Sequence, residues 1–325
     1  MSLHVIVGAS GVGVATARLL AGRGDQVKIV TRGGAGPDHS AIERIAADAT
    51  DAGRLSVIAA GAVALYNCAN PRYDRWLTDW PPLASALLAA AEHTGAVLAS
   101  AATLYGYGPA AGPMSETTPL AATHPKLRLR AQMWRDALAA HQAGRIRSTE
   151  LRASDFIQGT GLFGLTVAKA VLAGKRALVT VPPDQPHSFT SVNDAATALI
   201  TAAGDQRAGG QAWHAPTNPP LTLRQLATRY AEITGAPPPK LTTIPYPVLW
   251  TAGVFVPIVR ELRTTRYQWH RPFIMNSAAT QDTLGLKPEP LDDALREAAQ
   301  LARHSAASHP GDRRLQHANH RPQIS

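Results

Sequence analysis

The stretch that decides the fold is Leu3-His4-Val5-Ile6-Val7-Gly8-Ala9-Ser10-Gly11-Val12-Gly13, followed by Val14-Ala15-Thr16-Ala17-Arg18-Leu19-Leu20. Apolar residues at strand length lead into three glycines and then into an Ala- and Leu-rich segment. This order predicts a strand, a tight turn and a helix. The N-terminus of such a helix offers free N–H groups and a positive dipole end to a phosphate. We therefore expect a dinucleotide-binding turn at Gly8 to Gly13.

The end of the next predicted strand indicates which dinucleotide is bound. Residues 26–30 are strand-like and run into Thr31-Arg32-Gly33-Gly34, and the next acidic residue is Asp38. In dinucleotide-binding sheets this strand end meets the adenosine ribose, where an acid holds the 2′-OH of NAD and an arginine suits the 2′-phosphate of NADP. Arg32 therefore predicts NADPH (NADP+) as the cofactor. The competing interpretation is a solvated surface arginine.

Composition limits the class of protein. The chain has 325 residues, 45% of them hydrophobic, which is enough for a large α/β domain with a small lobe. No run reaches the ~18 apolar residues of a membrane span. The first strand begins within a few residues of Met1, which leaves no room for a signal peptide. Cys68 is the only cysteine, so no intrachain disulfide forms. We expect a cytoplasmic protein.

The net charge of +9 has no matching nucleic-acid motif. Many of the basic residues are arginines scattered through Ala-rich segments, and others lie after residue 303, where we expect a disordered basic tail (304–325). Helix-turn-helix, zinc-finger and aromatic RNA-binding signatures are absent. The twelve histidines show no His-x-x-x-His spacing. We predict a small-molecule substrate, with no nucleic-acid, membrane or metal partner; the sequence does not decide the oligomeric state.

Strand-like and helix-like segments alternate through the first half of the chain. Strands are expected at 42–47, 63–70, 96–100 and 147–154, and helices at 52–60, 82–94 and 125–143. Alternation of this kind predicts an α/β fold: a doubly wound parallel (Rossmann) sheet with ligands at the carboxyl ends of the strands. We assign 1–155 to this domain, completed by elements near 187–215, and 156–303 to a smaller C-terminal substrate lobe.

Seven short motifs occur in a characteristic order between residues 3 and 300. They are Gly8-x-x-Gly11, Asp48-Ala49-Thr50-Asp51, Ser100-Ala101-Ala102-Thr103-Leu104-Tyr105-Gly106, Ser115-Glu116-Thr117-Thr118-Pro119-Leu120, Arg152-Ala153-Ser154-Asp155, Ser188-Phe189-Thr190-Ser191-Val192-Asn193-Asp194 and Leu284-Gly285-Leu286-Lys287-Pro288. In this order the chain resembles the extended and atypical short-chain dehydrogenases/reductases, in particular their sugar-nucleotide epimerase/dehydratase branch. The third glycine, Gly13, departs from that branch by one position. The resemblance implies a Rossmann domain with a small substrate lobe.

The turn, the strand ends and the resemblance together define a predicted cofactor site. It comprises Gly8, Ser10, Gly11, Val12, Gly13, Thr31, Arg32, Asp48, Ala49, Cys68, Ala69, Asn70, Ser100, Ser154 and Asp155. Within this set we expect Cys68 to be a small packing residue and not a nucleophile, because no neighbouring base is identifiable.

The catalytic residues of the resembled family are replaced. That family uses a Ser/Thr, a Tyr that exchanges a proton with the substrate, and a Lys four residues later that lowers the tyrosine pKa. Matching through Tyr105-Gly106 places Ala101, Lys126 and Arg130 at these three positions, and no Tyr-x-x-x-Lys occurs elsewhere.

The remaining catalytic candidates are Lys126, Ser100 and Thr103. The alternative interpretation is that Lys126 lies on an ordinary solvated helix face and that the two hydroxyls make only local hydrogen bonds. Tyr105 is set aside as a structural residue of the family, and Tyr107 is an alternative acid.

Three interpretations of the chemistry stay open. The protein binds NADP(H) as a sensor without catalysis, transfers hydride with substituted acids, or acts on a ketone that carries its own proton donor. A ketone next to a phenol, as in an aromatic polyketide, is of the third kind, and orientation then supplies most of the rate. We predict an NADPH-dependent ketoreductase of an angucyclinone-type aromatic polyketide. The alternatives are the sensor and a sugar-nucleotide epimerase/dehydratase-like enzyme.

Overall fold

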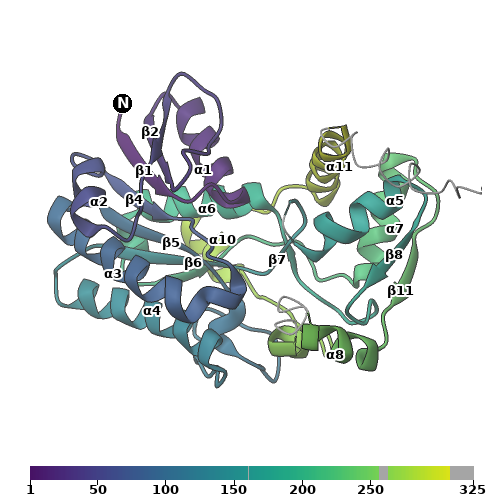
Figure 1. Cartoon of the computed structure of the whole chain (residues 1–325). Helices are drawn as coiled ribbons and strands as arrows, with labels where there is room; N and C mark the ends of the chain where they lie inside the picture. Colours follow the sequence, from purple (N-terminus) through teal and green to yellow (C-terminus); the bar gives the residue numbers. More distant parts are fainter. Residues whose placement is uncertain (160, 256–262, 308–325) are drawn as a thin grey trace, which may run out of the picture.

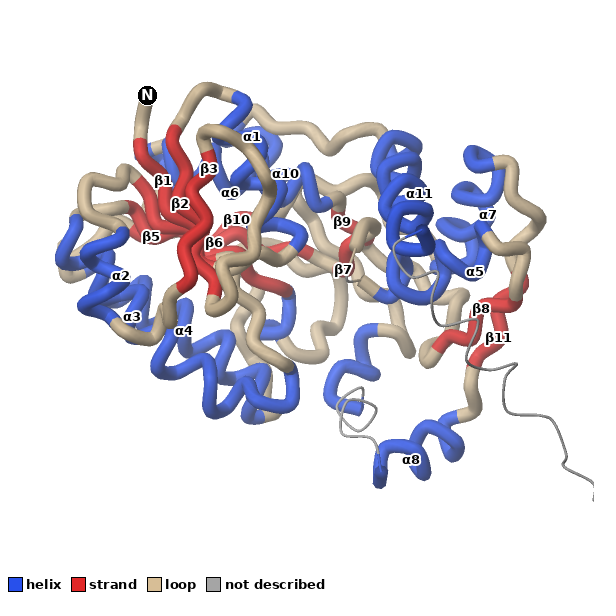
Figure 2. Tube along the Cα trace, turned by 45° about the horizontal axis from the view of Figure 1, so that its top comes forward, coloured by secondary structure: helices blue, strands red, loops and turns tan. Residues whose placement is uncertain are grey.

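The computed structural model of the chain describes residues 1–159, 161–255 and 263–307, and its largest element is a parallel sheet (Figures 1 and 2). The sheet has seven strands in the order β10-β6-β5-β4-β1-β2-β3. The order confirms the predicted doubly wound α/β fold. The strands are β1 (Leu3–Val7), β2 (Gln26–Thr31), β3 (Ile42–Ala46), β4 (Ala64–Asn67), β5 (Val97–Thr103), β6 (Ser148–Ala153) and β10 (Ala212–His214).

Helices cover both faces of the sheet because its central strands carry apolar residues on both faces. In β1, Ile6 packs on the face covered by α1 (Gly11–Gly22) and α6 (Val192–Gly204). Val5 and Val7 point to the other face, where α2 (Ala52–Ile58), α3 (Trp76–Thr94) and α4 (Pro125–Gln142) lie (Figure 2). All five residues of β1 are buried or nearly so, as a parallel strand covered on both sides requires.

One strand end differs from its prediction in a way that matters for the site. β5 does not end at Ser100 but continues to Thr103, because residues 101–103 pair with Leu151, Arg152 and Ala153 of β6. The carboxyl end of β5 is therefore Thr103. Ser100 lies inside the strand and shares the face of Leu98, towards α3 and α4.

The rest of the chain forms a smaller lobe beside the sheet (Figure 1). Its two-stranded sheets pair β7 (Asp155–Phe156) with β9 (Phe189–Thr190), and β8 (Arg176–Val179) with β11 (Lys240–Thr243). Its own apolar core includes Phe163, Leu226 and Tyr230. The helices after α4 are α5 (Lys169–Leu172), α7 (Leu223–Thr234), α8 (Tyr246–Phe255), α10 (Ala278–Leu284) and α11 (Leu291–Ala307).

The tail predicted at 304–325 overlaps the end of a helix. α11 runs to Ala307, so residues 304–307 are helical, because the amphipathic pattern with buried Ala298, Ala299 and Ala302 carries the helix past residue 303. Residues 308–325 lie outside the described part of the chain. No helix in the described ranges is long and apolar enough to cross a bilayer.

A buried chain of hydrogen bonds ties the β5–β6–β10 edge together. Arg152 donates to the Tyr107 oxygen (2.7 Å), and that hydroxyl lies 2.7 Å from Nε2 of His214. Nδ1 of His214 lies 2.7 Å from the carbonyl of Asn276, which can only accept, so Nδ1 carries the proton and Nε2 accepts from Tyr107. Tyr107 is thus 2% exposed and bound inside the fold, not a free acid facing a substrate as the sequence allowed.

The buried His214 in this hydrogen-bond network makes the stability of the protein depend on pH. Burial lowers the pKa of His214 to about 4, from 6.5, so the folded state binds fewer protons than the unfolded state between these values. The free energy of unfolding therefore falls as pH drops from about 6.5 to about 4, by about 3 kcal/mol for this one group. We expect urea titrations to show a steeper acid-side loss for the wild type than for His214→Gln.

Comparing the wild type with His214→Gln removes the contribution of Asp194 to the pH dependence, which has the opposite sign. Burial raises the pKa of Asp194 to about 7, which stabilises the folded state as pH falls. Asp194 is present in both proteins, so its effect cancels in the difference. Parallel pH curves for wild type and variant would contradict the assignment to His214.

Candidate cofactor and substrate site

The glycine turn brings β1 and α1 into unusually close contact. Gly8 has φ +101°, and a Cβ there would lie 2.6 Å from Cα of Ala69. A Cβ at Gly13 would lie 2.1 Å from the carbonyl oxygen of Gly8. Ser10 caps α1 by accepting from the Gly13 N–H at 3.3 Å. The first N–H groups of α1 therefore point out at the carboxyl edge of the sheet, where a phosphate can accept from them.

A hollow of about 600 Å³ extends from this turn to the end of β2. Arg32 lines it and is exposed; within the described chain its guanidinium makes no hydrogen bond or ion pair. Asp48 lines the same hollow, and hydrogen bonds from Thr50 hold the pKa of its carboxyl below the usual value. An unpaired guanidinium beside an open hollow is suited to bind a phosphate.

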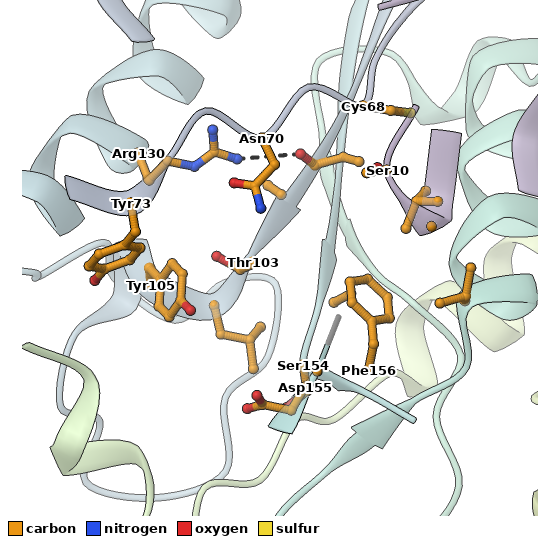
Figure 3. A pocket seen from close by; sticks show the side chains of 18 of the residues that line it. Ser10, Cys68, Asn70, Tyr73, Thr103, Tyr105, Arg130, Ser154, Asp155 and Phe156 are labelled. Atoms are coloured by element: carbon orange, nitrogen blue, oxygen red, sulfur yellow. Dashed lines mark hydrogen bonds between the residues drawn. The ribbon is translucent and has the colours of Figure 1, made fainter. Parts of the chain in front are cut away.

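A second hollow, of about 210 Å³, continues from the first, and both share Ser10, Ala69 and Asn70. Two buried hydroxyl oxygens, on Thr103 and Ser154, line it and have no hydrogen-bond partner in the described chain. Aromatic side chains also line it, among them Tyr73, Trp76, Tyr105, Phe156 and Phe273. Figure 3 shows Thr103 and Tyr105 on one side of this cavity and Ser154, Asp155 and Phe156 on the other.

All but two of the predicted cofactor residues line this continuous groove. Gly8, Ser10, Thr31, Arg32, Asp48, Ala49, Ala69 and Asn70 line the first hollow, and Gly11, Val12, Cys68, Ser154 and Asp155 line the second. Gly13 lies beneath, where its missing side chain permits the close contact of helix and strand. Ser100 is displaced: it lines a separate hollow between α3, α4 and the sheet, because β5 continues past it.

The residues that replace the catalytic triad, Ala101, Lys126 and Arg130, lie in different surroundings. Ala101 and Arg130 line the cavity, and Nη2 of Arg130 donates to the Ala101 carbonyl at 3.3 Å (Figure 3, dashed line). The Arg130 guanidinium lies 4.3 Å from the Trp80 ring centre, and burial lowers its pKa. Lys126 is 6% exposed, does not line the cavity, and donates to the Tyr73 carbonyl at 2.9 Å.

Tyr105 has a larger part in the cavity than the sequence indicated. Its ring is half-buried, 5.7 Å from the Trp76 ring. Burial raises its pKa well above the usual value, and the charge of Asp155 adds to this. The phenol therefore stays protonated near neutral pH and can donate a hydrogen bond into the cavity. Cys68 behaves as predicted for a packing residue: burial raises its thiol pKa to about 12.

A histidine–aspartate pair at the cavity wall has no signal in the sequence. Nε2 of His187 lies 2.8 Å from Oδ2 of Asp155, and the two residues are 32 positions apart. His187 is fully buried, and its ring stacks on Trp269. Long-range pairing by the β7–β9 ladder brings them together, which no spacing rule predicts. Among the described residues, no group of three His, Cys, Asp or Glu is placed to hold a metal ion.

Comparison with known proteins identifies the fold. No protein-family model and no curated protein sequence matches the chain. Solved structures do match over almost its whole length. One is a UDP-glucose 4-epimerase from Thermotoga maritima, with UDP-glucose, at a TM-score of 0.76 and 15% identity; the match covers 94% of this chain and 99% of that one.

Two further solved structures are similar to the chain. MoeE5 in complex with UDP-glucuronic acid and NAD gives a TM-score of 0.74 at 21% identity, covering 93% of this chain and 99% of that one. DesIV, a dTDP-glucose 4,6-dehydratase from Streptomyces venezuelae, gives 0.72 at 19% identity, covering 95% and 98%. The chain therefore has the fold of these structures, a parallel sheet of the Rossmann type with a smaller C-terminal lobe.

Proposed function

We propose that the protein is an NADP(H)-dependent reductase of an aromatic ketone, for which an aromatic polyketide is the substrate class. Bound NADPH would supply the hydride. The groove fits a dinucleotide: the N–H groups at the start of α1 suit the diphosphate, and Arg32 suits a 2′-phosphate. The orphan hydroxyls of Thr103 and Ser154 offer hydrogen bonds at the other end of the groove.

The observation that carries the proposal is the aromatic cavity continuous with that groove. Tyr73, Trp76, Tyr105, Phe156 and Phe273 present flat apolar surfaces, which favour a fused aromatic ligand by burial and ring stacking. A ketone held between such surfaces is oriented beside the cofactor, and orientation alone supplies a large part of the rate.

The proton has two sources in this arrangement. Reduction of a ketone leaves an alkoxide, which a phenol on the substrate itself can protonate or stabilise. Tyr105 offers the second source, because its phenol stays protonated and lines the cavity. Thr103 and the neutral Tyr105 supply donors to the developing charge, so a separate tyrosine–lysine pair is not required.

A sugar-nucleotide epimerase or dehydratase is the second candidate, and the likeness to solved structures of those enzymes favours it. Its substrates carry a diphosphate, which needs cationic or N–H partners beyond those that hold the cofactor. The cavity instead presents aromatic rings and the Asp155 carboxylate, and the guanidinium of Arg130, which also lines it, is directed to the Ala101 carbonyl. This chemistry favours a ligand without negative charge.

The test follows the absorbance of reduced nicotinamide with a panel of hydroxylated aromatic ketones. We expect oxidation of NADPH that requires both protein and ketone. UDP-glucose and dTDP-glucose with NAD+ form the parallel arm, read by product chromatography. Turnover of a nucleotide sugar, with none of any ketone, would replace the proposal by the second candidate. Tight NADPH binding without turnover in either arm would leave a sensor.

The position of Lys126 leads to a further prediction. Lys126→Met keeps the apolar stem but removes the donor to the buried Tyr73 carbonyl, so we expect a loss of about 1–2 kcal/mol in the free energy of unfolding. Because Lys126 does not line the cavity, kcat should stay within about threefold, by comparison with single-donor losses of ~10²-fold or more. Thermal unfolding and steady-state kinetics measure both. A hundredfold lower kcat at unchanged stability would restore Lys126 as a catalytic residue.

A further inference from the structure

Asp155 holds a fixed position at the wall of the substrate cavity. It lies where β6 gives way to β7, and its carboxylate projects into the cavity (Figure 3). Oδ2 is 2.8 Å from Nε2 of His187, and since a carboxylate only accepts, Nε2 carries the proton. The imidazole stacks on Trp269 with ring centres 3.9 Å apart and planes at 9°. His187 is fully buried, so it cannot turn away from Asp155.

The second carboxylate oxygen of Asp155 is left for a ligand. No hydrogen bond to Oδ1 occurs in the described chain, and the Asp155 side chain is 29% exposed. Phe156, Phe273 and Tyr105 line the cavity around it. Figure 3 shows Arg130 on the opposite side of the cavity, where its guanidinium is directed to the Ala101 carbonyl.

We propose that Asp155, held by His187, is a substrate-selecting residue that accepts a hydrogen bond from a hydroxyl group of the ligand. The ligand class is a neutral aromatic ketone that carries a phenolic hydroxyl away from the reacting carbonyl. This inference rests on the proposed function, because it concerns the same cavity. His187 is a positioning residue, since it acts through Asp155.

Two interactions of the Asp155 carboxylate would produce this selection, one attractive and one repulsive. A hydroxyl that donates to a carboxylate forms a short, charge-assisted hydrogen bond, about twice as strong as a neutral one. A ligand that carries its own carboxylate or phosphate at that point meets a like charge at close range, and the repulsion between the two charges weakens its binding. Asp155 therefore selects a hydroxyl donor and rejects an anion.

The experiment measures binding and does not depend on turnover. The probes are a phenolic tetralone, its O-methyl ether and its carboxylate analogue, all substituted at the same ring position. Each is titrated by calorimetry into protein saturated with NADP+. For the wild type we expect the phenol to bind about 10- to 100-fold more tightly than the ether, the factor that a hydrogen bond to a charged group provides. The carboxylate should bind at least as weakly as the ether.

Asp155→Asn is the informative variant because it keeps the shape and changes the chemistry. The amide oxygen can still accept from His187, which turns the NH₂ group towards the cavity. We expect the phenol-to-ether ratio to fall below about threefold and the carboxylate probe to gain about tenfold or more. His187→Phe keeps a stacking ring but removes the donor, so the ratio should fall to an intermediate value.

Asp184→Asn is the matched control, because Asp184 is an exposed aspartate that pairs with Arg224 and does not line the cavity. It should keep the wild-type ratio. An unchanged ratio in Asp155→Asn with an intact melting transition, or no binding of any probe to the wild type, would overturn the inference. Failure of the proposed function gives a different result: the probes keep their order of affinity, yet no ketone oxidises NADPH.

Discussion

Gly13→Ala is expected to destabilise the protein by about 3 kcal/mol and to abolish dinucleotide binding. The added Cβ would lie 2.1 Å from the carbonyl oxygen of Gly8 and 3.1 Å from Cβ of Cys68. The first of these is a backbone atom of the strand's own turn, so the helix must move away from β1. Forced overpacking of this kind costs about 1–3 kcal/mol, or more where backbone must shift. In a protein of 325 residues that lowers Tm by roughly 4 °C.

The same movement displaces the first turn of α1, whose N–H groups form the phosphate end of the groove. Differential scanning calorimetry and fluorescence titration with NADPH measure the two effects. Gly22→Ala is the control, because a Cβ at the end of the same helix meets nothing within 4 Å. Gly22→Ala should leave both Tm and affinity unchanged or slightly raise Tm. Normal NADPH affinity in Gly13→Ala would show that the turn is not the cofactor cradle.

Arg32→Asp is expected to reverse the cofactor preference. Arg32 is exposed beside the first hollow and has no partner in the described chain, so its guanidinium is available to a 2′-phosphate. Loss of those charge-assisted bonds costs about 1.5–3 kcal/mol, and the new carboxylate repels the phosphate. We expect NADP+ to bind about 100-fold more weakly and NAD+ to gain several-fold, since an acid there can hold the 2′-OH.

Arg75→Ala is the control for this exchange. Arg75 lines the same hollow but is bonded to Asp79 at 3.1 Å, so its removal should change the NADP+ to NAD+ ratio by less than about threefold. The ratio is read from fluorescence titrations of each cofactor. A wild-type preference for NAD+, or an Arg32→Asp variant with the wild-type ratio, would contradict the assignment of NADP(H).

The groove along the carboxyl edge of the sheet could be predicted because its signals are local. Gly8, Arg32 and Asn70 each follow a strand, and a parallel sheet brings the carboxyl ends of its strands to one edge. Ser100 does not line this groove, and the reason is also local. Three further residues of β5 pair with β6, so the strand ends later than its pattern indicates. In a strand, an inner residue faces a helix layer and not the ligand edge.

The substrate side could not be predicted, because it depends on contacts between distant segments. Matching to a family motif gives the position of Lys126 in the chain but not the direction of its side chain, which is buried against Tyr73. Asp155 and His187 meet only through the pairing of β7 with β9. The raised pKa of Tyr105, which keeps its phenol protonated, depends on its burial and on the charge of Asp155, and sequence spacing reveals neither.

We propose that this groove transfers hydride from NADPH to an aromatic ketone. The most direct measurement uses NADPH that carries deuterium at the transferable ring position, a phenolic aromatic ketone, and mass spectrometry of the product. We predict an alcohol that is one mass unit heavier than the product from unlabelled cofactor, formed only when the protein is present. Unlabelled or absent alcohol from every ketone, with NADPH bound to the protein, would contradict it.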